Sequence, residues 1–374
     1  MPKLLFLVTE DWYFCSHRLV LASEAKRHGY DVVVATRVNN HRECILSNGL
    51  KLIPITMLRN GRNPWTELLS ICELIRIYRS ERPDLVHHVA IKPVVYGSLA
   101  ARISGVPMVV NAIAGMGYVF ASQSWKARIL RPVLKCAMRI LLNRPNTRII
   151  LQNPDDFSML VGAGVADPER TDLILGSGVD VEQFQPFPDP DGETMVMMVS
   201  RMLWEKGVGE FVEAARLLKY EGIRARFVLV GDSDTENPGT VPRAQLKAWN
   251  DEGTVVWWGH QNDMPAVLAQ SHIVCLPSYY REGVPKSLIE AASCGRPIVT
   301  TDSPGCREIV KDGENGFLVP VRDSAALAAA VGKLLNDPHL RRRFGTRGRE
   351  LVIEKFSLER VVTDTLSVYG KLTT

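Results

Sequence analysis

Two glutamates, Glu282 and Glu290, flank a short stretch that is suited to holding a negatively charged group. The stretch follows a predicted strand at 273–276 and opens a predicted helix at 287–293. Pro285 suits the first turn of that helix, where its missing N–H has no consequence. The backbone N–H groups at 283–287 and the helix dipole predict an anion site beside Glu282, and Glu290 lies roughly 8 Å further along. One carboxylate can hold a sugar and the other a ribose, with a diphosphate between them. The alternative is a capped, buried helix with a solvent-facing glutamate.

Two cations, Arg201 and Lys206, follow the first predicted strand of the C-terminal half, at 195–199. Lys206 precedes Gly207 at the predicted start of a helix. Cations at the carboxyl end of a strand can clamp a departing diphosphate. Arginines and lysines are also common on surfaces near strand ends. A cation pair and a glutamate pair on separate loops of one domain together predict a nucleotide-diphosphate site.

Strands and helices that could hold these loops alternate along the whole chain. This pattern predicts an α/β fold with doubly wound parallel sheets. In the first half we predict helices at 17–28, 65–80 and 94–104, and strands at 4–9, 31–36, 50–55, 85–88, 108–111, 147–151 and 173–175. In the second half we predict strands at 195–199, 227–230, 255–258, 273–276 and 298–300, and consecutive helices from about 324 to 369.

The domain boundaries follow from a proline-rich stretch in the middle of the chain. We predict Rossmann-like domains at 1–182 and 194–350 with a linker at 183–193. A C-terminal helix at 351–374 is expected to pack back toward the N-terminal domain. Open α/β sheets bind ligands at the carboxyl ends of their strands, so we expect the two domains to face a central cleft. Dehydrogenases and periplasmic binding proteins share this plan, so the site must decide the function.

Composition narrows the class further. The chain has 374 residues, 46% of them hydrophobic and 23% charged, with a net charge of +4 and seven cysteines. Seven scattered cysteines favour reduced thiols and a cytoplasmic protein. The sequence offers neither a signal peptide nor a membrane span. No acidic residue occurs between Asp84 and Asp155, whereas nine lysines and arginines do, which indicates a surface for an anionic partner. Nucleic acid is not among the partners that we predict.

Several motifs resemble glycosyltransferase family 4, whose members are retaining, nucleotide-sugar-dependent enzymes with the GT-B fold. The resemblance covers essentially the whole chain and is densest at 195–320. It is carried by Ser200-Arg201, Glu205-Lys206-Gly207, Leu229-Val230-Gly231-Asp232, Gly259-His260, Asp263-Met264, Pro277-Ser278, the Glu282 and Glu290 pair, Asp302-Ser303-Pro304-Gly305 and Asp312-Gly313-Glu314-Asn315-Gly316.

A bacterial subgroup of that family, which builds polyprenyl-diphosphate-linked glycans and includes an N-acetylgalactosaminyltransferase, shares further motifs. These are Glu10-Asp11-Trp12, Ser16-His17-Arg18, Lys92-Pro93, Gly115-Met116-Gly117-Tyr118 and Gly176-Ser177-Gly178-Val179-Asp180. Many family members have a glycine-rich turn after the first strand, and here an acidic and aromatic turn, residues 10–13, replaces it.

The resemblance implies that the N-terminal domain binds an acceptor and the C-terminal domain a nucleotide sugar, and it implies a role for each matched residue. Arg201 and Lys206 would neutralise the departing diphosphate, Glu290 would bind the ribose hydroxyls and Glu282 would hold hydroxyls of the transferred sugar. The backbone at Gly283, Val284 and Pro285 would position sugar or phosphate, and His260 and Gln261 would lie against the base. His17, expected at the start of the first helix, and Lys92 would contact the acceptor. For His17 a helix-capping or core role is the alternative.

Three motifs suggest other chemistry that we do not predict. Asp232-Ser233-Asp234 matches a metal-binding tripeptide of a different glycosyltransferase fold, but here it ends a strand. The pair His87-His88 lacks further ligands at zinc spacing. Trp257 and Trp258 are expected to form a buried strand. We therefore predict neither a metal nor a cofactor.

A basic amphipathic helix is predicted at 124–142. Arg128, Arg131, Lys135 and Arg139 recur at intervals of three and four on one face, and Ile129, Val133, Cys136 and Ile140 lie on a neighbouring face. Pro132 can kink or divide this helix. Such a helix is a candidate for binding an anionic membrane surface or an acceptor diphosphate. The alternative is a solvated basic face above a buried apolar stripe.

The sequence thus predicts a retaining glycosyltransferase that moves a hexose or N-acetylhexosamine from a nucleotide sugar to a polyprenyl-diphosphate-linked saccharide. UDP is the favoured nucleotide and UDP-N-acetylgalactosamine a candidate donor. The expected location is the cytoplasmic face of the cell membrane. The alternatives are a nucleotide-sugar 2-epimerase or hydrolase of the same fold and a non-catalytic nucleotide-sugar-binding protein.

Overall fold

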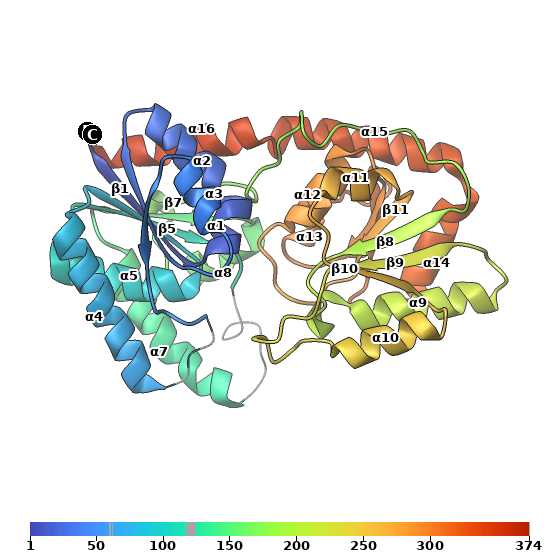
Figure 1. Cartoon of the computed structure of the whole chain (residues 1–374), viewed down its shortest axis with the longest axis horizontal. Helices are drawn as coiled ribbons and strands as arrows, with labels where there is room; N and C mark the ends of the chain where they lie inside the picture. Colours follow the sequence, from blue (N-terminus) through green and yellow to red (C-terminus); the bar gives the residue numbers. More distant parts are fainter. Residues whose placement is uncertain (60, 62, 117–124, 374) are drawn as a thin grey trace. The chain divides into compact units, whose positions relative to one another are not determined.

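The computed structural model describes residues 1–59, 61, 63–116 and 125–373, and only the backbone of 125–127 and 373. Two units divide the chain (Figure 1). Unit 1 comprises Met1–Ser177 and Glu359–Thr374, and unit 2 comprises Gly178–Leu358. Each unit is built around its own parallel sheet. The fold class predicted from strand and helix alternation is therefore confirmed.

In the described part of unit 1, seven parallel strands pair in the order β3-β2-β1-β4-β5-β6-β7. Their bounds are β1 Lys3–Glu10, β2 Asp31–Arg37, β3 Lys51–Pro54, β4 Leu85–Val89, β5 Met108–Ile113, β6 Thr147–Leu151 and β7 Thr171–Leu173. Strand β1 lies in the middle, and its residues from Leu4 to Val8 are almost completely buried. A continuous apolar strand of this kind is typical of a parallel sheet that is covered on both faces.

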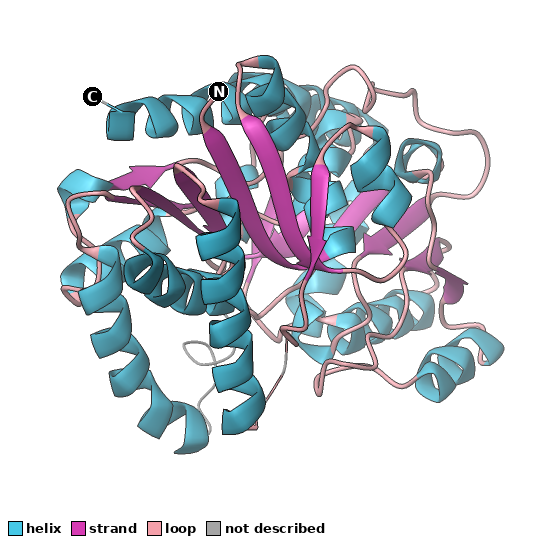
Figure 2. Ribbon diagram, turned by 60° about the vertical axis from the view of Figure 1, so that its left-hand side comes forward, coloured by secondary structure: helices cyan, strands magenta, loops and turns pink. Residues whose placement is uncertain are grey.

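Helices cover both faces of the unit 1 sheet (Figure 2). They are α1 Asp11–His17, α2 Leu19–Arg27, α3 Arg42–Ser47, α4 Pro64–Glu81, α5 Ile91–Ser104, α7 Trp125–Leu142, α8 Pro154–Gly162 and α16 Leu358–Thr373. Leu74 and Tyr78 of α4 and Ala100 of α5 pack against the strands in one apolar cluster. A second cluster joins α5, α7 and α8 to β5 and β6, through residues such as Met138 and Leu160.

In unit 2 the described strands pair in the order β10-β9-β8-β11-β12-β13, again all parallel. The strands are β8 Met195–Val199, β9 Arg226–Val230, β10 Val256–Gly259, β11 Ile273–Leu276, β12 Ile298–Thr301 and β13 Gly316–Val319. The helices are α9 Val208–Tyr220, α10 Arg243–Asp251, α11 Met264–Ala269, α12 Lys286–Ser293, α13 Cys306–Ile309, α14 Ser324–Asn336 and α15 Pro338–Lys355.

Several helices start where a polar side chain caps their first turn. Asn63 accepts from the N–H of Trp65 at the start of α4, and Asp337 accepts from the N–H of Leu340 at the start of α15. In both cases a proline follows the cap and supplies a backbone that is preset for a helix. Helix α12 differs, because its N-cap residue is Pro285 and no side chain caps it.

The first helix differs from the prediction. Instead of one helix at 17–28, α1 begins directly after β1 and ends at His17, and α2 begins at Leu19. Arg18 separates them, with φ of −130° and ψ of −13°. The predicted position of His17 at the start of a helix is therefore wrong: it ends one.

Two strand predictions also need correction. The last strand of unit 1 lies at Thr171–Leu173 and not at 173–175, because Asp172 pairs with Ile150 of β6. The sequence pattern missed β13 altogether. The sequence of β13 is short and begins with a glycine, so it does not predict a strand. Strand β13 forms because it pairs with β12.

The predicted linker at 183–193 is packed into unit 2. Phe184 is only 6% exposed, and its carbonyl accepts from the guanidinium of Arg349 at 2.8 Å. Asp189 lies 3.5 Å from Arg296 and 3.3 Å from Arg341. The segment 183–193 has the irregular backbone that its prolines predict. It belongs to unit 2 and does not form a free linker.

The chain end departs from one continuous helix at 351–374. Helix α15 runs to Lys355, and α16 begins at Leu358. Helix α16 belongs to unit 1, where the hydroxyl of Tyr369 lies 2.6 Å from Nδ1 of His87 and Lys371 lies 2.6 Å from Asp172.

Candidate active site

The centre of the candidate site in unit 2 is an ion pair between the loops that follow β8 and β11. Nζ of Lys206 lies 2.5 Å from Oε1 of Glu282, and the two side chains are 14% and 12% exposed. A charge pair shielded to this degree is screened less by salt than a pair on the surface. Two residues that the sequence placed on separate motifs therefore meet in the fold.

Ser278 holds Glu282 from the other side. Its hydroxyl donates to Oε1 of Glu282 at 2.8 Å, and its own carbonyl accepts from the hydroxyl of Thr301 at the end of β12. Side chains from the loops after β8 and β11 thus fix one carboxylate oxygen, and the end of β12 supports Ser278. Ser278 belongs to one of the family motifs, but no role was predicted for it. Its position four residues before Glu282 is the signal that could have found it.

Two glycines allow these loops to approach so closely. Gly207 has φ of +81°, and a Cβ there would lie 2.2 Å from the carbonyl oxygen of Pro277. Gly305 has φ of +83°, and a Cβ there would lie 1.5 Å from the carbonyl oxygen of Gly283. Only glycine fits both the backbone conformation and the space at these positions. Both glycines therefore allow the loops of the site to approach one another.

Glu290 lies on α12 and is almost completely buried, at 7% exposure. Burial raises its pKa above the usual 4.5, and Lys286, 3.3 Å away, opposes this rise. Val284 is also buried, beside Gly283. Pro285 was predicted within the first turn and is instead the N-cap residue, with the helix starting at Lys286. A carboxyl group held in this way is a candidate for binding hydroxyls.

Glu205 is an acidic neighbour of Lys206 and Glu282 for which no role was predicted. Burial raises its pKa above 4.5, Lys206 and Arg201 oppose the rise, and Glu282 adds to it. The site therefore gathers two carboxyl groups and two cations at the ends of β8 and β11. Functional sites often bring acidic and basic side chains close together and shift the pKa of one of them, as happens here for Glu205.

Arg201 lies near this group but is held by a carboxylate. Its Nη1 lies 2.6 Å from Oδ2 of Asp234, and its side chain is 41% exposed. Asp232 is paired with Arg243, whose Nε donates to Oδ1 at 2.9 Å, and the pKa of Asp232 is lowered mainly by that bond. Both aspartates of the Asp-Ser-Asp tripeptide therefore form ion pairs with arginine side chains. Among the described residues, no group of three or more His, Cys, Asp or Glu side chains could hold a metal ion.

His260 and Gln261 follow β10 at the edge of the sheet. His260 is exposed, and the amide of Gln261 donates to the carbonyl of Trp258 at 2.9 Å. Trp257 donates from Nε1 to the carbonyl of Gly231 at 2.8 Å. The prediction that both tryptophans are buried is wrong, because both are half-buried at the outer strand of the sheet.

In unit 1 the turn after β1 is a network around two buried acids, Glu10 and Asp11. Asp11 is fully buried and accepts from the N–H groups of Trp12, Asn39 and His41 at 2.7, 2.6 and 2.9 Å. Burial pushes its pKa up, but these three bonds outweigh burial and lower the pKa below 3.8. Glu10 accepts from Arg37 at 2.9 Å. Backbone and side-chain donors of unit 1 therefore hold both acids of this turn.

His17 closes α1 beside an aromatic side chain. Its ring stacks on Tyr13, with centroids 4.1 Å apart and planes 5° from parallel, and its Nδ1 lies 2.5 Å from the hydroxyl of Ser16. It is half-buried and not part of the core.

Lys92 lies in the first turn of α5, after β4. Its Nζ lies 2.7 Å from Oε2 of Glu67, donates to the carbonyl of Leu58 at 2.6 Å and lies 5.4 Å from the centroid of the Tyr96 ring. The preceding Ala90 has φ of 77° and ψ of 159°, a conformation that is otherwise almost restricted to glycine. An acceptor contact by Lys92 would compete with its bond to Glu67.

The histidine pair lies in the core of unit 1. His88 is fully buried between the hydroxyl of Tyr78 at 3.0 Å and Oδ1 of Asn111 at 2.8 Å, and burial lowers its pKa to about 4. His87 is 1% exposed and bonds Tyr369. These contacts explain both histidines as core residues.

The predicted basic helix is α7, which runs through Pro132 without ending. Arg128 and Arg139 are exposed, and Arg131 and Lys135 are half-buried. The apolar stripe beside them is also exposed: Ile129 by 65%, Val133 by 63% and Ile140 by 55%, and Cys136 as well. The alternative of a buried apolar stripe is therefore wrong. The motif residues Gly117 and Tyr118, and residue 124 at the predicted helix start, lie outside the described residues.

Comparison with known proteins gives the family and the fold of the chain. A family model described as glycosyl transferase 4-like matches residues 3–153, and one described as glycosyl transferases group 1 matches residues 180–351. Sucrose-phosphate synthase from Thermosynechococcus elongatus matches the whole chain with a TM-score of 0.82 at 20% identity, covering 99% of that structure. The Anabaena protein HepE, solved with UDP and glucose, matches 99% of this chain and 100% of its own with a TM-score of 0.78 at 18% identity. The fold is GT-B, and the class is a glycosyltransferase.

Two curated relatives are similar over most of their length. N,N'-diacetylbacillosaminyl-diphospho-undecaprenol alpha-1,3-N-acetylgalactosaminyltransferase of Campylobacter jejuni is 28% identical over 337 residues, 87% of each chain. UDP-Gal:alpha-D-GlcNAc-diphosphoundecaprenol alpha-1,3-galactosyltransferase of Escherichia coli is 28% identical over 284 residues, 72% of this chain and 71% of that one. The chain belongs to glycosyltransferase family 4 and is a hexosyltransferase.

Proposed function

We propose that this glycosyltransferase moves a hexose or N-acetylhexosamine from a UDP-sugar to a saccharide carried on a polyprenyl diphosphate, with retention at the anomeric carbon. The observation that carries the donor half of the proposal is the shielded pair of Lys206 and Glu282 beside the uncapped start of α12. UDP-N-acetylgalactosamine is the first donor to test. The two relatives that act on undecaprenol-linked diphosphates support the acceptor class.

The chemistry needs little covalent help from the protein. The bond between C1 of the sugar and the diphosphate oxygen breaks, and a bond from the acceptor oxygen to C1 forms on the same face. The acceptor proton passes to the leaving phosphate oxygen, so that the products are UDP and the extended saccharide. Lys206 and Arg201 would meet the charge that grows on the diphosphate, which is where a positioned cation lowers the barrier. Each would exchange its carboxylate partner for the phosphate.

Glu282 and Glu290 would bind hydroxyl groups in this proposal. Ser278 would keep Glu282 in place after Lys206 turns to the phosphate, so that Glu282 presents its carboxylate to the transferred sugar. Glu290, raised in pKa by burial, would accept from or donate to the ribose. Gly283, Val284 and Pro285 would lie along the diphosphate, and His260 and Gln261 against the base. His17 and Lys92 of unit 1 would contact the acceptor.

Incubation with UDP-N-acetylgalactosamine and a short polyprenyl-diphosphate saccharide tests this function. We expect UDP release and a product larger by one sugar, with an α anomeric proton in its NMR spectrum. A β linkage would contradict retention. Sugar release or C2 inversion without acceptor would favour the hydrolase or 2-epimerase, and binding without any turnover would favour a non-catalytic protein.

The exposed faces of α7 support docking on an anionic membrane at the cytoplasmic face. Basic and apolar residues are exposed side by side there, and Trp65 and Leu69 of α4 are 75% and 66% exposed. A basic residue near an anionic bilayer contributes about 1 kcal/mol. None of the described helices is long and apolar enough to cross a membrane.

Vesicle co-sedimentation tests the docking. We expect binding to anionic but not neutral vesicles, weakened by salt, and lost when Arg128, Arg131, Lys135 and Arg139 become glutamine. The matched control removes four exposed cations of unit 2, Lys219, Arg224, Lys247 and Lys311, with an equal change in net charge. If vesicle binding falls equally in both variants, overall charge explains the binding and α7 is not a specific docking surface.

A further inference from the structure

A cavity in unit 1 lies at the strand ends opposite to those that precede His17 and Lys92. It has a volume of about 310 Å³ and opens where β5 and β6 begin. Its lining comes from the end of α5, the turn into β5, the end of α7 and the turn into β6: Ser98, Ala101, Arg102, Gly105, Val106, Pro107, Val109, Leu141, Arg144, Asn146 and Thr147.

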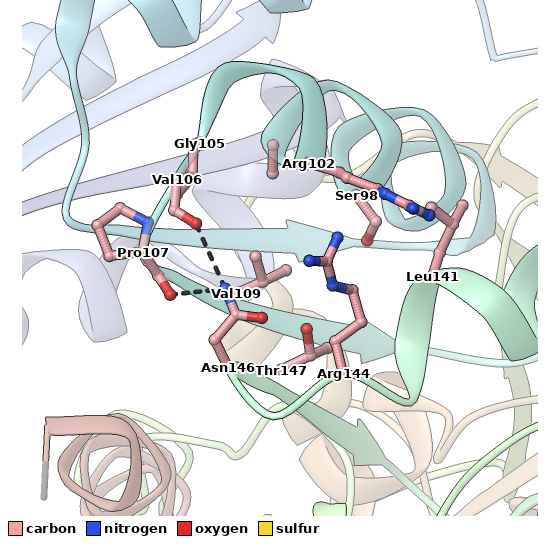
Figure 3. A pocket seen from close by; sticks show the side chains of 11 residues that line it. Ser98, Arg102, Gly105, Val106, Pro107, Val109, Leu141, Arg144, Asn146 and Thr147 are labelled. Carbon is pink, nitrogen blue, oxygen red and sulfur yellow. Dashed lines mark hydrogen bonds between the residues drawn. The ribbon is translucent and has the colours of Figure 1, made fainter.

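Two arginines line this cavity from different elements, and Arg102 is exposed while Arg144 is half-buried. Figure 3 shows Arg102, from α5, and Arg144, from the turn after α7, extending into the same space. Neither forms an ion pair with a described carboxylate within 4 Å. The whole lining lies inside the acid-free tract between Asp84 and Asp155. Two like charges that share a hollow repel each other, and an anion between them removes that repulsion.

The walls around the arginines are fixed by their own bonds. The amide of Asn146 donates to the carbonyls of Val106 at 3.4 Å and Pro107 at 2.7 Å (Figure 3). The hydroxyl of Ser98 donates to Asn111 at 3.0 Å. The floor is formed by the apolar side chains of Val106, Val109 and Leu141, which are buried, at 7%, 5% and 7% exposure. The cavity therefore combines a rigid apolar floor with two convergent cationic side chains.

We propose that this cavity binds a phosphoryl group carried on a small organic moiety, separately from the donor site. Guanidinium groups match the planar, bidentate recognition of phosphate oxygens. The volume lies at the lower limit for ligand pockets, which fits a phosphomonoester or diphosphate head better than a whole nucleotide sugar. The phosphoryl group can come from a free metabolite or from a lipid headgroup, because Leu141 and the basic face belong to the same helix, α7.

Calorimetry with inorganic pyrophosphate on protein already saturated with UDP tests the site. We expect a further binding event in the wild-type protein, weakened about tenfold or more in Arg102→Gln/Arg144→Gln. Arg79→Gln is the matched control, because Arg79 is an exposed arginine of α4 in the same unit. The proposal is overturned if UDP-saturated protein shows no such event or if the double variant binds as tightly as the control. Equal unfolding temperatures exclude misfolding as the cause.

A second arm identifies the source of the phosphoryl group. Glycerol 1-phosphate is titrated against bound pyrophosphate, and phosphatidylglycerol vesicles are sedimented with both variants. Competition together with reduced vesicle binding in the double variant indicates a lipid headgroup. Competition with unchanged vesicle binding indicates a free metabolite. Absence of both effects contradicts an organic phosphate ligand. The failure of sugar transfer has no bearing on this result, because the readouts are binding alone.

Discussion

The acidic residues after β1 in unit 1 and after β11 in unit 2 both lie at the carboxyl end of a parallel strand, but different groups hold them. Asp11 is held by three backbone N–H groups of its own unit, which lower its pKa. Glu282 is held by two side chains, Lys206 and Ser278, and Glu290 is buried with a raised pKa. Backbone donors cannot leave, whereas side-chain cations can rotate to a ligand. This difference supports the proposal that Asp11 is structural and that Glu282 and Glu290 bind substrate.

The largest expected effect comes from the unit 2 pair. Lys206→Ala should lower kcat by roughly 10²- to 10³-fold, because the lysine meets charge that develops in the transition state. Glu282→Gln should also lower transfer. Steady-state transfer assays measure both, and Lys247→Ala, an exposed lysine of α10, is the control. An unchanged kcat in Lys206→Ala would remove Lys206 from the catalytic site.

The same comparison predicts a stability effect without a donor-binding effect in unit 1. Asp11→Asn should lower the free energy of unfolding by about 2–3 kcal/mol, since a buried charged acceptor of three N–H groups is replaced by a weaker one. Because the folded pKa of Asp11 is lowered, its contribution is present above pH 3.8 and is lost as the pH falls through the folded value. Urea unfolding at pH 7 and pH 3 checks this, with the exposed Asp31→Asn as control. A loss of UDP affinity with unchanged stability would reverse the assignment.

Glu290→Gln should have the opposite effect on stability. Its folded pKa is raised above 4.5, so the protonated form is favoured in the folded state and that contribution is lost as the pH rises through the folded value. Glutamine should therefore raise stability by about 1 kcal/mol at pH 8, or about 2–4 °C in Tm, and not at pH 4.5. Thermal unfolding at the two pH values measures this. UDP affinity, measured by calorimetry, should fall, as it should in Arg201→Ala. If Arg201→Ala, Lys206→Ala and Glu290→Ala all bind UDP as the wild type does, the donor site is misplaced.

The smallest effect is expected at the Asp-Ser-Asp turn. Because Asp232 and Asp234 each pair with an arginine, Asp232→Asn should change transfer less than about threefold, consistent with the small contribution of exposed ion pairs. Transfer should also persist in excess EDTA, since the cations near the diphosphate are side chains. Complete loss in EDTA, restored by magnesium or manganese, would show that this turn holds a metal.

Local patterns in the sequence determined the parallel sheets, most strand bounds and the residue types of the donor site. Strands β1, β8 and β11 contain continuous apolar runs, which are typical of strands buried on both faces of a parallel sheet. Asn63 and Asp337 determine where two helices start, because their side chains cap the first turn. Glu282, Lys206 and Glu290 could be chosen because their chemistry and their places after strands are both local features.

Only the tertiary structure decided which groups meet. Lys206 and Glu282 are 76 residues apart in sequence, and no local pattern predicts this pair or the bond from Thr301 to the carbonyl of Ser278. The same holds for the bond of Lys92 to Glu67, for β13, whose burial comes from β12, and for the convergence of Arg102 and Arg144 on one cavity. Local propensity fixes the path of each element, but partners, burial and pKa depend on which distant loops the sheet order brings to the same strand ends.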